Sequence, residues 1–280
     1  MNQRVINYYK SLESRLGYTY LTGNIKHFGY YPKRIKGISE KEAQNLMHEL
    51  LVQKLQLKRN AVVLDAGSGR GTVATYLAYK YGVNIKGVDI VDFEVALAKK
   101  RAAHLGLDRN VQFFLKDYSN THFPAHSFDA IYTMETLVHA VSIHRALKEF
   151  NRVLKPGGRI ALFEYSIAKS SEFDPRTKAM LDLIIRYSAM QSLPTMHHDA
   201  IKKHLKTAGF IDIKTDDITN NVLPSMYRLY RYAYIPYQAI KLFHLQKYFI
   251  NTTWGVEMYH IFKKELLKYR IFTAKKPNGT

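Results

Sequence analysis

Residues 61–71, AVVLDAGSGRG, combine an apolar run with an acid and three closely spaced glycines. The run predicts a buried strand that ends near Asp65 and turns directly into a helix. Glycine permits positive φ and lets a ligand approach bare backbone, while the first helical turn offers unpaired amides. The third glycine comes one residue earlier than in the G-x-G-x-x-G spacing of dinucleotide-binding folds. The segment therefore predicts a cofactor-binding turn of another kind; the alternative is a glycine-rich turn without a ligand.

Acidic and aromatic residues that could complete such a site follow the next two apolar runs. Asp89 ends the run VNIKGVD and lies 18 residues beyond Gly71, close to the ~20 expected of an acid that binds ribose hydroxyls. The alternative role for Asp89 is to cap the helix that begins near Phe93, which Asp92 could also do. A third run, VQFFLKD, ends at Asp117 and Tyr118.

Strands and helices alternate along the chain, which predicts a parallel, doubly wound α/β sheet. A helix is expected over 38–57, where Ser39 and Glu42 form a capping box. Pro156 is expected to end the helix before the fifth strand. The predicted strands are 61–66, 83–89, 111–117, 128–135, 159–165, 210–216 and 269–276.

The order of these motifs resembles that of class I S-adenosyl-L-methionine (SAM) methyltransferases: D-x-G-x-G-x-G at 65–71, then Asp89, FDAIYTME and LKPGG. The resemblance implies a seven-stranded, mostly parallel, Rossmann-like sheet whose last strand inserts antiparallel between the fifth and sixth. It also implies SAM as the cofactor, with the glycine loop around the methionine moiety. The cofactor contacts it implies are Asp65, Ala66, Gly67, Ser68, Gly69, Gly71, Asp89, Ile90, Asp117, Tyr118 and Thr133.

A narrower resemblance concerns two segments beside this core. TGNIKHFGYYP (22–32) resembles the N-terminal lid of sterol C-methyltransferases and their tocopherol and ubiquinone relatives, and YTMETLVHA (132–140) is similar to their segment after the fourth strand. The resemblance implies that His27 and Tyr30 close over the site and that Glu164 contacts the acceptor. Val141 replaces the usual proline of the sterol enzymes, which favours a prenylated or polycyclic lipid-like acceptor over a sterol.

The expected reaction is methyl transfer to carbon or oxygen of that acceptor, which needs placement and a base. We predict His139 as the base, because it follows the fourth strand; the alternative is a helix-surface histidine bonded to backbone. Glu135 is predicted to be a pocket acid or cation stabiliser, the alternative being a helix-start carboxylate. Tyr30 completes the predicted catalytic set.

Neither a metal nor a covalent nucleophile is expected. His197 and His198 are adjacent, so on a helix they would point about 100° apart and could not bind one ion together. The sequence has no cysteine, which excludes disulfides and thiolate catalysis.

Two parts of the chain are predicted: an N-terminal helix and lid over 1–37, and a SAM-binding methyltransferase domain over 38–280. Helical insertions within the domain, at 166–198 and 219–266, are expected to cover the substrate, because they follow the strand ends where ligands bind. The start of the chain lacks the apolar core of a signal peptide and no window reaches ~18 apolar residues, which predicts a cytoplasmic protein.

The charge is strongly positive, with 42 Lys and Arg against 23 Asp and Glu, for a net charge of +19. Within 226–249, basic residues alternate with Tyr, Phe, Leu and Ile, a pattern typical of helices that lie on an anionic membrane. The same composition suits RNA or a solvated face over a lid. The second functional hypothesis is therefore a nucleic-acid-binding methyltransferase or a catalytically silent SAM-binding module.

Overall fold

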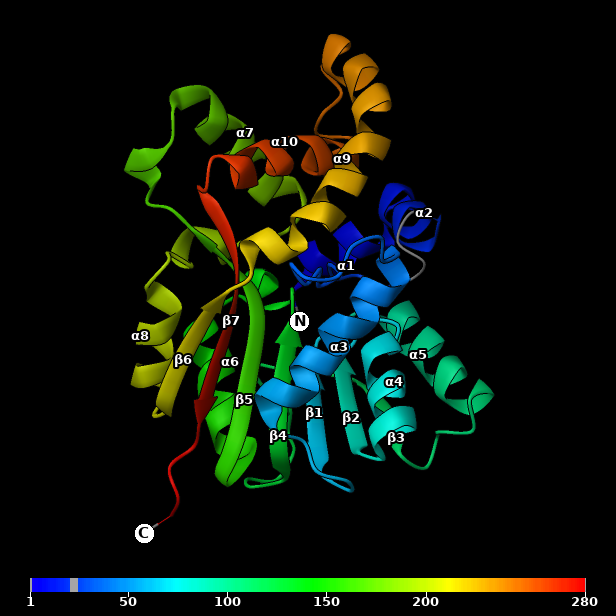
Figure 1. The fold of residues 1–280 in the computed structure, drawn as a ribbon, viewed down its shortest axis with the longest axis vertical. Helices are drawn as coiled ribbons and strands as arrows, with labels where there is room; N and C mark the ends of the chain where they lie inside the picture. The colour runs from blue at the N-terminus through cyan, green and yellow to red at the C-terminus, as the bar shows by residue number, and fades with distance from the viewer. Residues whose placement is uncertain (1, 21–24, 280) are drawn as a thin grey trace.

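A seven-stranded sheet forms the centre of the molecule, in a computed structural model that describes residues 2–20 and 25–279 (Figure 1). The strand order is β3-β2-β1-β4-β5-β7-β6. All neighbours are parallel except β7, which pairs antiparallel with both β5 and β6. The predicted seven-stranded, mostly parallel sheet is thus confirmed. The strands are β1 (Val62–Ala66), β2 (Asn84–Asp89), β3 (Val111–Leu115), β4 (Phe128–Met134), β5 (Leu154–Ile167), β6 (Ile211–Asp217) and β7 (Leu267–Lys275).

Helices cover both faces of the sheet (Figure 1). On one face lie α3 (Glu40–Leu55), α4 (Thr72–Tyr81) and α5 (Asp92–His104); on the other lie α6 (Ile143–Val153) and α8 (Ala200–Thr207). The predicted capping box is present at α3, where Ser39 N donates to Glu42 Oε2 over 2.7 Å and Glu42 N donates to Ser39 Oγ over 3.3 Å. Leu64 and Ile131 are fully buried between the layers. Burial of such side chains stabilises the fold by about 1.5–3 kcal/mol each.

The fifth strand is longer than predicted, because it begins at Leu154 instead of Arg159. Pro156 disfavours the helical conformation at Lys155, so α6 ends at Val153 and the chain becomes extended at once. Gly157, at φ 72°, then shifts the register of the β4–β5 pairing by a bulge. The motif LKPGG therefore belongs to the strand itself.

A third layer of helices lies beyond the carboxyl ends of the parallel strands (Figure 1). The segments predicted as insertions supply α7 (Pro175–Tyr187), α9 (Thr219–Leu242) and α10 (Ile250–Lys263), and the N-terminus supplies α1 (Gln3–Lys10) and α2 (Leu12–Tyr20). Short 3-10 helices are η1 (Leu137–His139), η2 (Ser170–Glu172) and η3 (Leu193–Thr195). Among the described residues, no helix is both long and apolar enough to cross a membrane.

Candidate active site

The glycine loop that follows β1 leaves no room for a Cβ atom at two of its three glycines. Gly67, Gly69 and Gly71 have φ of 95°, 50° and 70°. A Cβ on Gly67 would lie 2.5 Å from Thr136 Cγ2, and one on Gly71 would lie 2.3 Å from Phe113 Cζ. A Cβ on Gly69 would meet no atom of the described residues closer than Lys26 Cδ, at 3.9 Å. The loop is therefore packed on its two sides and open at Gly69.

Asp89, at the end of β2, holds this loop in place. Its Oδ2 accepts a hydrogen bond from Gly69 N over 2.8 Å, and its Oδ1 accepts one from Val91 N over 2.9 Å. The alternative role as the N-cap of the next helix does not apply, because α5 begins at Asp92 with Val91 in the capping position. Burial raises the pKa of the Asp89 carboxyl, an effect that the Lys26 ammonium opposes.

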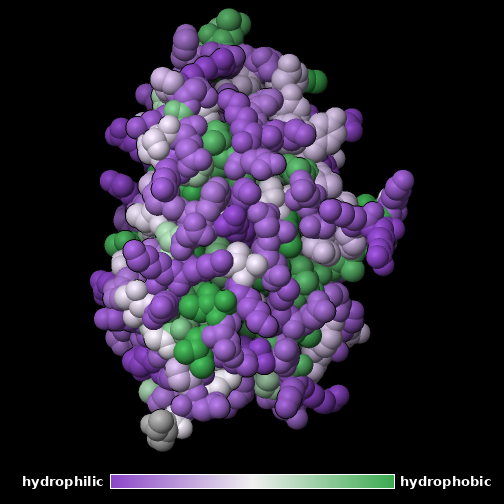
Figure 2. Space-filling model, turned by 60° about the vertical axis from the view of Figure 1, so that its left-hand side comes forward, coloured by the Kyte–Doolittle hydropathy of each residue, from purple (hydrophilic) through white to green (hydrophobic). Residues whose placement is uncertain are grey.

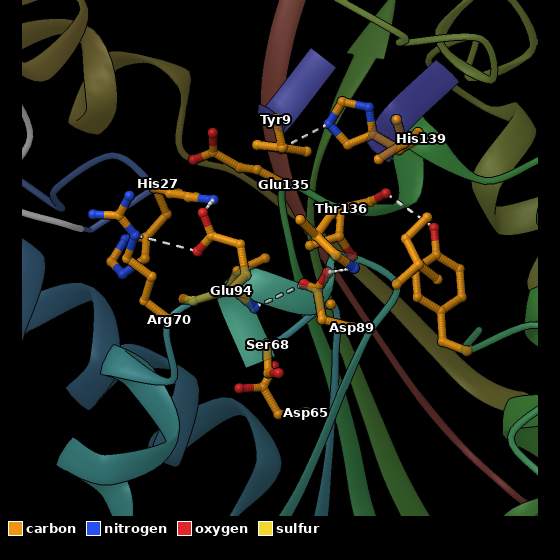
Figure 3. Close-up of a pocket in the computed structure, with 18 of the residues that line it drawn as sticks. Tyr9, His27, Asp65, Ser68, Arg70, Asp89, Glu94, Glu135, Thr136 and His139 are labelled. Atoms are coloured by element: carbon orange, nitrogen blue, oxygen red, sulfur yellow. Dashed lines mark hydrogen bonds and ion pairs between the residues drawn. The ribbon is translucent and has the colours of Figure 1, made fainter. Parts of the chain in front are cut away.

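The loop and the ends of the neighbouring strands enclose a first cavity of about 110 Å³, which we call the cofactor cavity (Figure 3). The predicted cofactor residues that line it are Asp65, Gly67, Ser68, Gly69, Asp89, Ile90, Asp117 and Tyr118. Three predicted residues do not: Ala66 and Thr133 are buried within their strands, and Gly71 caps α4. The buried Ser68 hydroxyl has no hydrogen-bond partner in the described part of the chain, as expected of a wall built for a polar ligand.

One wall of the cofactor cavity is an ion cluster around the buried carboxylate of Glu94. Lys26 Nζ lies 2.9 Å from Glu94 Oε1, and Arg70 Nε lies 3.3 Å from Glu94 Oε2. The Lys26 ammonium also lies 4.2 Å from the ring centroid of Tyr9, within cation–π range. Burial lowers the pKa of Lys26, although Glu94 favours its charged form. The cluster ties the segment before α3 to the glycine loop and to α5.

A second and larger cavity, of about 630 Å³, lies beside the first, and we call it the acceptor cavity. Its walls come from α1, α2, α9 and α10, and its floor includes Phe28, Tyr165 and Trp254. Phe28 stacks on Trp254 with ring centroids 6.0 Å apart, and Tyr165 meets Trp254 edge to face at 6.5 Å. Such a wall suits a large apolar molecule.

The two cavities share part of their walls, which we call the junction. The residues that line both are Tyr9, Ile25, Lys26, His27, Glu135 and His139. Three of them were predicted for the site from sequence: His27, Glu135 and His139. A ligand in either cavity would therefore contact the same side chains from opposite sides.

Glu135 is held at the junction by an unusual backbone conformation. It follows β4 with φ 57°, a left-handed value that costs free energy for a non-glycine residue. Its Oε1 accepts a hydrogen bond from Phe28 N over 2.9 Å, and its Oε2 accepts one from the Tyr165 hydroxyl. Burial raises the pKa of the Glu135 carboxyl to about 7. The alternative of a helix-start carboxylate is not supported by this geometry.

His139, at the end of η1, uses both ring nitrogens within the protein. Its Nδ1 donates to Ala189 O over 2.9 Å, so Nε2 is the acceptor and receives the Tyr9 hydroxyl at 3.1 Å (Figure 3). Burial lowers the pKa of His139 to about 4, which makes it neutral and a weak base at pH 7. His139 therefore lines the site, as predicted, and also makes the hydrogen bond to backbone that the alternative interpretation expected.

The remaining predicted site residues are divided between the cavity walls and the core. His27 lines both cavities; its Nδ1 donates to Phe28 O over 2.9 Å, and its Nε2 lies 2.9 Å from His48 Nε2. Tyr30 lines neither cavity and packs against the hydrophobic core. Residues 22–24 of the predicted lid lie outside the described residues.

Glu164 is a correction to the predicted acceptor contacts. It is fully buried and lines neither cavity, and its Oε1 instead accepts hydrogen bonds from Thr136 N at 3.2 Å and Leu137 N at 3.0 Å. Glu164 is buried because both faces of β5 are covered at its position. Its two hydrogen bonds fix the turn that follows β4. Burial raises its pKa to about 8.

Among the described residues, no group of three His, Asp or Glu is placed to bind a metal ion.

Several lining residues were not predicted from the sequence. Tyr9 and Trp254 belong to helices whose only sequence signal was amphipathic or aromatic, and Glu94 belongs to a helix without a motif. Arg70 occupies one of the unspecified positions of the motif D-x-G-x-G-x-G, so the motif does not predict a role for it. Lys26, Arg70 and Glu94 are far apart in the sequence and come together only in the folded chain, so no local pattern marks the cluster.

The sequence is similar to known methyltransferases and their relatives. The methyltransferase domain family matches residues 64–162, which include the glycine loop, Asp89, β4 and most of β5. The S-adenosyl-L-methionine-dependent Diels-Alderase iccD of Talaromyces variabilis is 36% identical over 98% of this chain and 96% of its own length. Sterol 24-C-methyltransferase ERG6 of Saccharomyces cerevisiae is 28% identical over 73% of this chain and 52% of its own length.

The fold has a similar match among solved structures. The [4+2]-cyclase SpnF superimposes with a TM-score of 0.79 at 23% identity, and the match covers 100% of this chain and 98% of that one. The match therefore includes the helical layer around the acceptor cavity as well as the sheet. On the family match and the full-length relative, the chain belongs to the class I SAM-dependent methyltransferases, with SAM as its cofactor.

Proposed function

We propose that this enzyme transfers a methyl group to a small lipid-like acceptor that lies in the acceptor cavity. The observation that supports this proposal is the junction, where six side chains face both cavities. When bound, SAM supplies a methyl group on a sulfonium, which is already activated for in-line transfer. The protein then has to align the acceptor, exclude water and accept a proton. The name of the sterol 24-C-methyltransferase relative is consistent with an acceptor of this class.

The residues present fit the cofactor. In this proposal Asp89 would accept hydrogen bonds from ribose hydroxyls, and Asp117 with Tyr118 would contact the adenine; all three line the cofactor cavity. The open backbone at Gly69 and the unpartnered Ser68 hydroxyl would face the methionine moiety. Lys26 and Arg70, which share the single carboxylate of Glu94, lie beside the same loop and would provide a counter-charge for the methionine carboxylate.

Glu135 is our choice for the base, in place of His139. A carboxyl with a pKa of about 7 is half ionised near neutral pH, which suits proton transfer. With a hydroxyl acceptor, the oxygen would take the methyl group and its proton would pass to a Glu135 oxygen. With a carbon acceptor, methyl addition to a double bond would leave a carbocation, and the proton that this cation loses would pass to the same Glu135 oxygen. His139 then acts as a positioning residue, because it fixes the Tyr9 hydroxyl at the junction.

A second candidate function is a [4+2] cyclisation in which bound SAM is not consumed. The observation that favours it is the identity of 36% to a Diels-Alderase over nearly the full length of both chains. This reaction moves no proton. A protonated Glu135 would donate a hydrogen bond to a carbonyl of the substrate and so withdraw electron density from the reacting double bond.

The two functions are separated by the fate of the methyl group and by the sign of the pH dependence. The enzyme is incubated with methyl-labelled SAM and a panel of prenylated quinols, polycyclic phenols and linear polyenes. Methyl transfer puts label in the product, and turnover rises as pH rises through about 7, because Glu135 must be ionised. Cyclisation leaves the label in SAM and the product unlabelled, and turnover falls over the same range, because Glu135 must be protonated.

The variant Glu135→Gln tests the role of this carboxyl. For methyl transfer, we expect turnover to fall about 10²- to 10⁴-fold with SAM affinity unchanged. For cyclisation, the amide still donates a hydrogen bond, so turnover is largely kept and its pH dependence is lost. Glu265→Gln, at an exposed position, is the matched control. Full activity of Glu135→Gln with an unchanged pH profile would exclude both roles.

The proposal also includes the predicted contact with an anionic membrane surface, and hence a peripheral membrane location. An acceptor of this class partitions into bilayers, and the basic aromatic segment 226–249 belongs to helices that form the acceptor cavity. Binding of RNA is the alternative for this segment.

A further inference from the structure

We infer that the tip of the α9–α10 hairpin, residues 231–249, docks on an anionic lipid bilayer and that the acceptor cavity opens within the docked surface. The inference rests on the proposed function in one respect, the lipid-like nature of the acceptor. In Figure 1 this hairpin projects from the body of the molecule at the end farthest from the C-terminus.

The charge of the hairpin is of one sign. From residue 218 to residue 256 the sequence has no Asp or Glu, whereas the tip carries Arg231, Lys241 and Lys247. Arg228, just before the tip, is paired with Glu40 at 3.5 Å and is not counted among these cations. The first acid after this stretch, Glu257, accepts a hydrogen bond from the Tyr237 hydroxyl. A surface of this kind is attracted to anionic lipid by about 1 kcal/mol for each nearby cation.

Apolar side chains at the tip are exposed to an extent unusual for a folded protein. The relative exposures of Ile235, Leu242 and Phe243 are 79%, 72% and 67%. Figure 2 shows hydrophobic atoms at this end of the molecule, surrounded by hydrophilic ones. Exposed aliphatic and aromatic groups beside cations are typical of helices that insert into the headgroup region of a bilayer.

The mouth of the acceptor cavity lies in the same surface. Tyr232, Tyr248 and Phe249 line the cavity and are 54%, 64% and 42% exposed. Leu12 and Leu16 of α2 line the opposite side and are 71% and 47% exposed. A bilayer that covers the tip would therefore also cover the rim, and an apolar acceptor could pass from lipid to cavity without crossing water.

The tip fits lipid better than nucleic acid. Next to the tip, Tyr230 packs against Tyr227 and Tyr259, with ring centroids 6.2 Å and 4.7 Å apart, so the neighbouring surface offers no separate ring platforms for bases at these three residues. The most exposed apolar residues, Ile235 and Leu242, are aliphatic and cannot stack on a base. Transfer of aliphatic groups from water into a bilayer lowers their free energy instead.

The test is sedimentation with vesicles of phosphatidylcholine containing phosphatidylserine, in the absence of acceptor. The test variant combines Lys241→Gln, Leu242→Ser and Phe243→Ser, none of which lines either cavity. The control variant combines Leu97→Ser, Lys99→Gln and Leu105→Ser. These three residues are exposed; Leu97 and Lys99 belong to α5, and Leu105 directly follows it. SAM titration is measured on all three proteins, as is turnover with the panel of prenylated quinols, polycyclic phenols and linear polyenes dispersed in detergent.

We expect the wild type and the control to bind anionic vesicles, and the test variant to bind about 30- to 100-fold more weakly with SAM affinity and detergent turnover unchanged. Absence of vesicle binding by the wild type, or equal binding by the test variant, would overturn the inference. So would tight, salt-dependent RNA binding that only the test variant loses. Failure of the proposed function would appear separately, as absence of turnover in detergent.

Discussion

The two cavities differ in the kind of structure that builds them. The cofactor cavity is made by strand ends and tight turns whose backbone is fixed by hydrogen bonds; Gly67 N and Ser68 N both donate to Val88 O, over 2.9 and 3.0 Å. The acceptor cavity is made by helices that contact one another through side chains, and much of its rim is exposed. Recognition in the first depends on backbone geometry, and in the second on side-chain shape. The first should therefore tolerate almost no change, and the second should change specificity readily.

The largest effect is expected for Gly67→Ala in the cofactor cavity. A Cβ there meets Thr136 at 2.5 Å in a conformation with φ 95°, so the loop must move, and we expect calorimetry to detect no SAM binding. Gly106→Ala is the matched control, because its φ is 66° but its Cβ would meet no described atom within 4 Å. That control should lose only ~1 kcal/mol of stability and keep its SAM affinity. Normal SAM binding by Gly67→Ala would contradict the assignment of the loop.

Asp89→Asn should have the next largest effect. The amide cannot accept from both Gly69 N and Val91 N as the carboxylate does, and the charge is lost. We expect SAM affinity to fall by ~2–4 kcal/mol, about 30- to 1,000-fold. The control is Asp92→Asn, an exposed acid three residues away, which should bind SAM normally. If both variants bound SAM equally well, Asp89 would have no role in the cofactor site.

A smaller and more selective effect is expected on the acceptor side. Trp254→Ala removes the ring that stacks on Phe28 and should lower kcat/KM for the acceptor about 10- to 100-fold, through the loss of apolar contact. SAM affinity should stay within twofold, because Trp254 does not line the cofactor cavity. A parallel loss of SAM affinity would show that the two cavities are not separable in the way described.

The smallest effect is expected for Glu164→Gln, and it concerns stability. Burial raises the pKa of Glu164 to about 8, so the folded state keeps its proton over a pH range in which the unfolded chain has lost it. The wild type is therefore expected to lose stability as pH rises from about 6 to 8, whereas the amide cannot ionise. The stability of the variant relative to the wild type should rise by ~1–2 kcal/mol over this range, as thermal or urea unfolding would measure. A constant difference across the range would show that Glu164 does not titrate there.

The sequence predicted the cofactor side far better than the acceptor side, for a physical reason. Local motifs such as Gly67–Gly71 encode backbone conformations, and these were found where they were expected. Trp254 and Tyr9 reach their cavities only because segments far apart in the chain pack together, which no local pattern encodes. Glu164 was misplaced because β5 is covered on both faces, so alternation along the strand does not distinguish a cavity wall from the core.

The shared wall of the two cavities has a thermodynamic consequence. Glu135, Lys26 and His139 line both cavities, so a ligand that ordered them on one side would change the free energy of binding on the other. Linkage makes this coupling reciprocal: the factor by which SAM changes the affinity for the acceptor equals the factor by which the acceptor changes the affinity for SAM. The affinity with which the enzyme holds SAM would therefore differ from one bound acceptor to another.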